Sequence, residues 1–503
     1  MAGVLKTGVA LTIAIAVAGC ATTAKQAVNP SALGVAEAAK AIRDKQVTST
    51  QLTQAALDRA EANAALNAFV TIDRTGALLA ARDADTELAN GKVKGPLHGV
   101  PLVVKDNIHV KGLPNTAGTP ALRGFVPQQN APTVQRLVDA GAIILGKTNM
   151  HELAFGISGY NQATFSAEPI GVRNPYDRNR FAGGSSSGTA AAIAAGIVPG
   201  GLGSDTGGSS RIPSSVTGGA GFRPTIGRYD NSAVTPISHT RDTVGPMART
   251  VADVALLDAV LTAATVPAAA SLKGVKLGVY RAYFFKNLDA DTTAVMDATL
   301  EKLKKAGASV VEVDMPDLQK HHSNASFPIA LYEAHEDMVR YLEKYGTRQS
   351  IESLASMIVS EDVKGTYNGL VVPRKLPTPD GLIDAAPVYE AAMKQARPAL
   401  IQHYADTFKK YGIDALVAPT TPHVAEVQGP DASKLETFLL FIQNTDPGSV
   451  AGIPGLSIPA GLGPTTRLPV GIAIDGPSGS DQKLLAIGMA IEKVLGPTPR
   501  AMP

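Results

Sequence analysis

Two clusters of glycine and serine, separated by a short run of small apolar residues, place the strongest constraint on how this chain can fold. The clusters occupy residues 183–188 and 203–210, and an alanine-rich run of helical length, residues 189–196, lies between them. Glycine lets a backbone approach a ligand closely, and successive N–H groups in such turns can hold an anion. Serine adds a hydroxyl that can act as a nucleophile or relay a proton.

A flexible linker is the alternative interpretation, because Gly/Ser-rich segments often have that role. A linker does not enclose an apolar helix between its halves, and it does not keep Asp205 and Arg211 beside one of its clusters. We therefore interpret residues 183–213 as a functional site.

The rest of the chain alternates between short apolar runs and helical patterns. Apolar runs predict buried strands at 100–104, 142–145, 275–280, 310–313, 415–418, 453–459 and 470–474. Helical spacing predicts helices within 31–64, 76–90, 133–140, 251–262, 289–306 and 482–495. This alternation predicts an α/β fold with a largely parallel sheet covered by helices. Residues 325–410 are mostly helical and polar, with a Pro-rich loop at 373–379, and are predicted to cap a pocket.

The composition excludes several classes of function. With 503 residues, 45% of them hydrophobic, the chain can bury a large core. A net charge of +2 gives no electrostatic basis for nucleic-acid binding, and the absence of Trp argues against stacking platforms. No apolar span of 18 residues follows residue 20, so no transmembrane helix is expected there.

The first twenty residues form a separate unit. Lys6 precedes an apolar run that is too short to span a membrane and that ends in VAGC at Cys20, the only cysteine of the chain. This arrangement resembles the lipobox of bacterial lipoproteins, in which cleavage leaves a lipid-bearing cysteine at the N-terminus. We predict a signal peptide at 1–20, a tether at 21–30 and membrane contact only through lipidated Cys20. The protein would then lie on the periplasmic side of an outer membrane, or at the cell surface where there is none. An ordinary secretory signal, or a buried helix with an incidental cysteine, is the alternative.

Three separated motifs, which agree in residue type, order and spacing, resemble those of the amidase signature family. They are LHGVPLVVKDN at 97–107, GGSSSG at 183–188 and GSDTGGSSRIP at 203–213, and the match continues with GFRPT at 221–225 and GPM at 245–247. The resemblance covers residues 31–496. It implies one α/β/α domain at 31–503 around a mixed sheet, cleavage of carboxylic amide C–N bonds in small molecules, and no metal or cofactor.

The resemblance also implies a Ser–Ser–Lys catalytic group. Ser209 would be the nucleophile, Ser185 a bridging serine preceded by a cis peptide bond, and Lys105 the base. The remaining implied roles are an oxyanion hole from the N–H groups of Thr206, Gly207, Gly208 and Ser209, support from Ser186, Asp205 and Arg211, and an acyl pocket along 154–157 that begins at Ala154.

Elementary chemistry is consistent with these roles. A serine hydroxyl becomes a good nucleophile only when a base removes its proton. Lysine can be that base only when neutral, and lowering its pKa from about 10.4 to 7 costs about 4 kcal/mol. Desolvation at the end of a buried strand, where Lys105 is predicted, can supply this shift.

Residues 150–156 (MHELAFG) and 227–229 (GRY) resemble the branch of the family that hydrolyses arylalkyl amides such as indoleacetamide and mandelamide. A small apolar or aromatic acyl group is therefore the leading expectation. Esters, anilides, carbamates and peptide C-terminal amides stay open as substrates, because one oxyanion hole serves them all. The oligomeric state is also open, a homodimer included.

Other functions fit the sequence less well. Residues 184–188 also match G-x-S-x-G, which would make Ser186 the nucleophile of an α/β-hydrolase. A transfer-RNA amidotransferase subunit is opposed by the export signal, and a lipid-anchored binding protein without catalysis is opposed by the intact triad. One departure from the family pattern is Ser210, where relatives often have Ile or Val.

Overall fold

The computed structural model describes residues 2–4, 29–163 and 170–501. Cys20, most of the predicted signal peptide and residues 21–28 of the tether lie outside these ranges, so lipidation stays a prediction. Within them, no helix combines the length and the apolar character needed to cross a bilayer.

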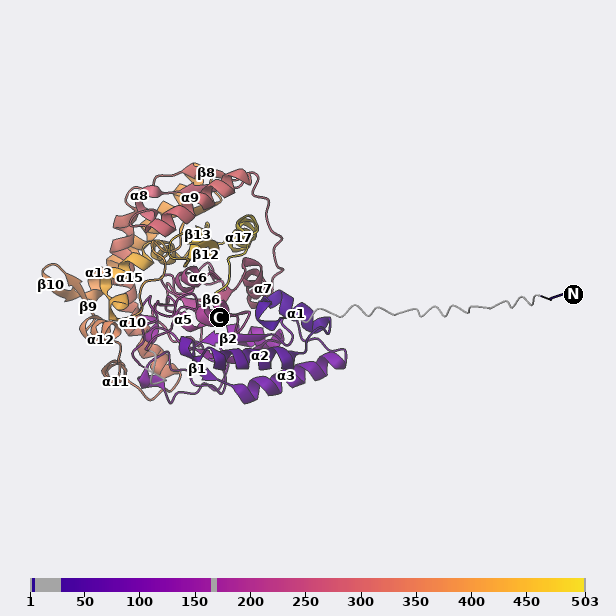
Figure 1. The fold of residues 1–503 in the computed structure, drawn as a ribbon. Helices are drawn as coiled ribbons and strands as arrows, with labels where there is room; N and C mark the ends of the chain where they lie inside the picture. The colour runs from indigo at the N-terminus through magenta and orange to yellow at the C-terminus, as the bar shows by residue number, and fades with distance from the viewer. Residues whose placement is uncertain (1, 5–28, 164–169, 502–503) are drawn as a thin grey trace.

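One mixed sheet of eleven strands runs through the described residues (Figure 1). Parallel pairing occurs on its two flanks, in the runs β3-β2-β4 and β11-β7-β8, and the other neighbours pair antiparallel. The predicted α/β fold with a mixed sheet is confirmed. In sheet order the strands are β1 (Phe69–Ile72), β3 (Ile143–Thr148), β2 (Pro101–Lys105), β4 (Gly200–Asp205), β6 (Thr243–Ala248), β5 (Ala220–Arg223), β12 (Gly455–Leu462), β13 (Pro469–Asp475), β11 (Ala415–Pro419), β7 (Lys276–Val279) and β8 (Ser309–Glu312).

Helices cover both faces of the sheet, which gives the predicted α/β/α layering. Apolar residues of α1 (Val35–Arg43), α4 (Pro132–Asp139), α7 (Val251–Thr262), α9 (Ala290–Lys305) and α17 (Asp481–Leu495) share one core with the first face. The opposite face is covered by α2 (Ser49–Ala62), α3 (Arg74–Ala89), α5 (Ser187–Ala194) and α6 (Arg211–Thr217). Shorter helices are α8 (Arg281–Phe284), α15 (Leu435–Ile442) and α16 (Asp446–Ala451), with 3-10 turns η1 (Pro30–Ala32), η2 (Ala64–Leu66), η3 (Pro120–Leu122), η4 (Glu152–Ala154) and η7 (Pro430–Ser433).

The alternation of side chains along β2 decides where Lys105 points. Leu102 and Val104 belong to the core under α7, whereas Val103 belongs to the core under α5. Side chains two residues apart share a face of a strand. Lys105 therefore projects toward α5, the helix that follows the first Gly/Ser cluster.

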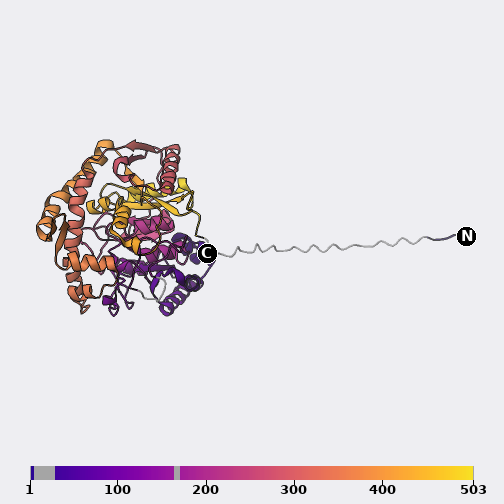
Figure 2. The same ribbon diagram turned by 60° about the vertical axis from the view of Figure 1, so that its left-hand side comes forward.

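A helical excursion forms one side of the molecule (orange in Figures 1 and 2). It consists of α10 (Leu318–Lys344), α11 (Ile351–Ser356), α12 (Glu361–Thr366), α13 (Ala385–Ala391) and α14 (Arg397–Tyr411), with π-helical turns η5 (Tyr367–Val371) and η6 (Ala392–Ala396). The prediction of an irregular Pro-rich loop at 373–379 is wrong, because β9 (Lys375–Thr378) and β10 (Gly381–Asp384) form an antiparallel hairpin there. This hairpin projects from the body of the molecule in Figure 1.

Candidate active site

Lys105 reaches the first Gly/Ser cluster from the end of β2. Its Nζ lies 2.7 Å from Ser185 Oγ and 2.8 Å from Ser204 Oγ, and its side chain is fully buried. Burial lowers the pKa of Lys105 to about 7, although the charges of Asp205 and Asp242 act in the opposite direction. An amine with this pKa is available as a base near neutral pH.

The two Gly/Ser clusters are joined through their backbones. The N–H of Ser186 donates to the carbonyl oxygen of Ser209 at 3.1 Å, which holds the two segments side by side. The peptide bond between Gly184 and Ser185 is cis, as predicted. Gly188 lets the first cluster pack closely against Ala68 and Asn149, because a Cβ there would lie 2.2 Å from the carbonyl oxygen of Ala68.

Asp205 anchors the second cluster. Its carboxylate accepts hydrogen bonds from the N–H groups of Gly208 and Ser210 and pairs with the buried side chains of Arg211 and Arg223. Burial alone would raise the pKa of Asp205, but the two guanidinium groups outweigh it and hold the pKa far below its usual range. Asp205 and Arg211 therefore support the loop rather than face the substrate.

The turn that follows Asp205 is held rigidly through its carbonyl groups. The carbonyl oxygen of Gly207 accepts from Thr445 Oγ1 at 2.6 Å, and that of Gly208 accepts from the N–H of Ile212 at 2.7 Å. A Cβ at Gly208, where φ is +137°, would lie only 2.2 Å from Thr445 Oγ1. The turn thus requires glycine at this position.

The structure differs from the expectation for one oxyanion donor. The N–H of Gly208 donates to Asp205 Oδ1 at 2.9 Å, so it is used inside the loop. The predicted donors are therefore reduced to the N–H groups of Thr206, Gly207 and Ser209.

Ser186 is bound into the sheet and does not face a cavity. Its Oγ donates to the carbonyl oxygen of Ser204 at 3.1 Å and accepts from the N–H of the same residue at 3.2 Å. The side chain is fully buried. These bonds support the predicted structural role of Ser186 and oppose its role as a nucleophile.

A largely apolar cavity of about 480 Å³ opens in front of Ser209. Residues 154–157, which the resemblance assigns to the acyl pocket, contribute one wall of this cavity. The helical excursion contributes another wall through Phe327, Leu331 and Leu370. We name this space the apolar cavity; its other apolar walls include Ile212, Leu435, Phe438 and Ile442.

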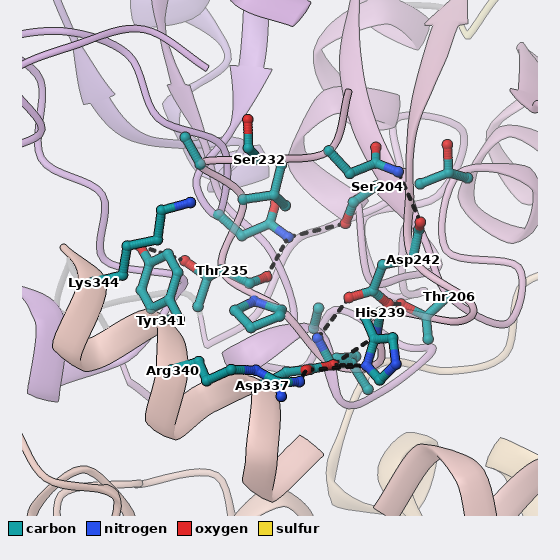
Figure 3. A pocket seen from close by; sticks show the side chains of 18 of the residues that line it. Ser204, Thr206, Ser232, Thr235, His239, Asp242, Asp337, Arg340, Tyr341 and Lys344 are labelled. Carbon is teal, nitrogen blue, oxygen red and sulfur yellow. Dashed lines mark hydrogen bonds and ion pairs between the residues drawn. The ribbon is translucent and has the colours of Figure 1, made fainter. Parts of the chain in front are cut away.

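A second cavity, of about 400 Å³, lies beside the first (Figure 3). Ala154, Thr206 and Ile237 line both spaces. We name the second space the polar cavity; its polar lining includes Asn107, Ser204, Thr235, Asp242, Asp337 and Tyr341. Asp242 Oδ1 accepts from Thr206 Oγ1 at 2.6 Å, and removal from water raises the pKa of this carboxyl to about 6.

Sequence reasoning missed several residues of the site. Ser204, the second partner of Lys105, directly precedes Asp205 in the quoted motif, and this position was the available signal. Arg241 and Asp446 form a buried ion pair in the wall of the apolar cavity, and Arg241 also donates to the carbonyl oxygen of Thr206 at 3.3 Å. Arg241 and Asp446 are far apart in the sequence, so no sequence motif indicated that they would pair.

Within the described residues, His239, Glu333 and Asp337 bring three possible metal ligands together. Protein groups already use them: His239 and Arg340 pair with Asp337, and Ser238 Oγ donates to Glu333 at 2.6 Å. Ion pairs and hydrogen bonds within the protein therefore explain why these three side chains lie together.

Comparison with known proteins extends this description. Residues 51–485 match the protein family described as Amidase. Mandelamide hydrolase from Pseudomonas putida is 44% identical over 470 residues, covering 93% of this chain and 92% of that protein. Indoleacetamide hydrolase from Agrobacterium vitis is 39% identical over 92% of this chain and 97% of that protein. The solved structure of native peptide amidase from Stenotrophomonas maltophilia is similar with a TM-score of 0.79 at 30% identity, covering 92% of this chain and 96% of that one. The chain therefore belongs to the amidase family and is an amide-bond hydrolase.

Proposed function

We propose that the protein hydrolyses arylalkyl and similar small apolar amides through an acyl-enzyme on Ser209. The observation that carries this proposal is the contact of 2.7 Å between Lys105 Nζ and Ser185 Oγ in a fully buried site. A buried amine with a pKa near 7 and a hydroxyl beside it supply the proton acceptor that a serine nucleophile needs.

In the first half of the reaction, Ser209 Oγ attacks the amide carbonyl carbon. Its proton passes to Ser185 Oγ while the Ser185 proton passes to neutral Lys105. The negative charge that develops on the carbonyl oxygen is stabilised by the N–H groups of Thr206, Gly207 and Ser209, each worth about 3 kcal/mol in comparable sites. The C–N bond then breaks as Lys105 returns the proton, through Ser185, to the leaving nitrogen.

In the second half, water attacks the acyl carbon and gives its proton to the same relay. The bond from the acyl carbon to Ser209 Oγ then breaks, and the relay returns the proton to Ser209. The carboxylic acid leaves, and Lys105 is neutral again. Every proton taken by Lys105 is returned within one cycle, so no cofactor is required.

The apolar cavity supports the choice of acyl group. Phe327, Leu331 and Phe438 present apolar surface in front of Ser209, in a volume of about 480 Å³. Pockets of this size suit small organic ligands. The printed names of the two relatives, mandelamide hydrolase and indoleacetamide hydrolase, describe amides with an aromatic acyl part, and we propose substrates of the same kind here.

Two single substitutions test the mechanism. Ser209→Ala removes the nucleophile and is expected to lower kcat for mandelamide, phenylacetamide and indoleacetamide by about 10⁴-fold or more. Ser186→Ala is the matched control, because it removes the neighbouring hydroxyl and should change kcat less than tenfold. Trapping of a labelled acyl group on Ser209, seen by mass spectrometry, provides the second readout. Retained activity in Ser209→Ala, or loss confined to Ser186→Ala, would contradict the proposal.

A further inference from the structure

We infer that the polar cavity receives the nitrogen half of the substrate and that the enzyme accepts amides whose nitrogen carries a short polar substituent. This inference rests on the proposed role of Ser209. The two cavities meet at Ala154, Thr206 and Ile237, beside the turn that carries Ser209. An amide carbonyl carbon held at Ser209 carries its acyl group and its nitrogen in different directions. When the acyl group fills the apolar cavity, the nitrogen can be directed toward Thr206 and the polar cavity.

Polar groups on the wall of the polar cavity can bind a substituent on the nitrogen. Asp242 supplies a carboxylate that can accept from an N–H or hydroxyl group, and Ser204 and Thr206 supply hydroxyls. Ser204 Oγ also contacts Lys105 Nζ at 2.8 Å, so the nitrogen half of an amide would lie close to the proposed base.

The polar cavity is larger than is needed for ammonia, the leaving group of a primary amide. A molecule of ammonia is about as large as water, which occupies roughly 30 Å³ in the liquid. The cavity has a volume of about 400 Å³ and extends to Arg340 and Lys344 on α10, opposite Ser204 and Thr206 (Figure 3). The remaining space can hold a substituent with hydroxyl or other polar groups. A secondary amide would fill this space, and a primary amide would leave it empty.

The test compares primary and substituted amides of the same acid. Mandelamide and phenylacetamide are each assayed beside their N-(2-hydroxyethyl) derivatives. Ser232→Trp places a large side chain at an exposed position in the lining of the polar cavity (Figure 3), and Ser232 does not line the apolar cavity in front of Ser209. Ser478→Trp, on an exposed turn that lines neither cavity, is the matched control.

In Ser232→Trp, the ratio of kcat/KM for the substituted amide to kcat/KM for the primary amide is expected to fall about tenfold or more. In Ser478→Trp this ratio should stay as in the unmodified enzyme. A ratio that changes less than twofold in Ser232→Trp would overturn the inference. Cleavage of the primary amides without cleavage of either derivative by the unmodified enzyme would also overturn it. Neither outcome affects the proposed mechanism, which is tested separately by the activity of Ser209→Ala.

Discussion

Two buried lysines at the ends of neighbouring strands show how one residue type can serve chemistry or stability. Lys105 ends β2, and Lys147 is the next-to-last residue of β3, the parallel neighbour of β2. Both side chains are fully buried. Burial lowers the pKa of each lysine relative to its usual value. Burial therefore does not distinguish the two.

Their hydrogen-bond partners differ. Lys147 Nζ contacts Asn115 Oδ1 at 3.0 Å and the carbonyl oxygens of Pro114 and Asp106 at 3.2 and 3.4 Å, and it pairs with the Asp106 carboxylate at 3.4 Å. These oxygens accept from an ammonium and cannot donate to an amine. Lys105 contacts two hydroxyls, which can donate or accept. The chemistry of the partners, rather than the depth of burial, makes Lys105 suited to exchange a proton.

Of the substitutions that compare the two lysines, Lys105→Met is expected to have the largest effect, and that effect is on activity. Methionine keeps an unbranched side chain but removes the base, so kcat/KM for a primary amide should fall about 10²- to 10⁴-fold. The melting temperature should not fall, because an amine that is costly to bury is replaced by an apolar group of similar length. Steady-state kinetics and thermal unfolding at pH 7.5 provide the two measurements. A Lys105→Met enzyme with normal turnover would contradict the role of Lys105 as base.

Lys147→Met should show the reverse pattern. It leaves the Asp106 carboxylate buried without its cation, and breaking a buried ion pair in this way costs about 3–5 kcal/mol of unfolding free energy. The activity of the remaining folded protein should fall less than tenfold. Urea denaturation at pH 7.5 measures the free energy, and initial rates at low temperature measure the activity.

The double variant Lys147→Met with Asp106→Asn controls this experiment. Asparagine keeps an oxygen for the Thr116 and Gly118 N–H groups that Asp106 now binds, and it carries no charge. The double variant should therefore be more stable than Lys147→Met alone. Equal stability would mean that the isolated charge is not the source of the loss.

Much of the fold could be predicted from the sequence. The apolar runs at 100–104, 415–418 and 470–474 predict strands that the structure places at 101–105, 415–419 and 469–475. Strands rich in glycine and polar residues were missed. β4, with the sequence GGLGSD, is not among the predicted strands, and its last three residues belong to the second Gly/Ser cluster. Its strand conformation depends on pairing with β2 and β6, and these contacts are far away in the sequence.

The site was predictable where the chain is locally constrained and unpredictable where tertiary contacts decide. Residues 203–211 lie within one motif, so Asp205 and Arg211 could be recognised as supporting groups. The engagement of the Gly208 N–H by Asp205 depends on the angle of one peptide group, which a sequence pattern does not record. The sequence likewise contains Lys105 and Lys147 at the ends of similar apolar runs. The motif at 97–107 marks Lys105 by resemblance, but the physical difference between the two lysines lies in their folded contacts.

The smallest expected effect is a shift in pH dependence. It would follow from giving Lys105 a carboxylate partner like the one that Lys147 has in Asp106. With its pKa near 7, neutral Lys105 is lost as the pH falls through 7, so kcat/KM should fall about tenfold per pH unit below that value. Ser204→Asp adds a carboxylate beside Lys105 Nζ, and the polar cavity leaves room for it. An opposite charge at this distance raises the pKa of a lysine by about 1–3, so the acid limb of the profile should move upward by at least about one pH unit.

Ser204→Ala is the control for this shift, because it removes the same hydroxyl without adding charge. Asp242 supplies the competing explanation, since its own carboxyl has a pKa of about 6 and holds Thr206 in the turn. A negative charge at position 204 favours the protonated state of both Lys105 and Asp242, so the direction of the limb alone does not separate them. The separation comes from Asp242→Asn, which abolishes a limb that reports Asp242. A limb that reports Lys105 persists in Asp242→Asn and moves downward, because a negative charge near the amine has been removed. Loss of the limb in that variant would assign the titration to Asp242 and would remove the main support for Lys105 as the titrating base.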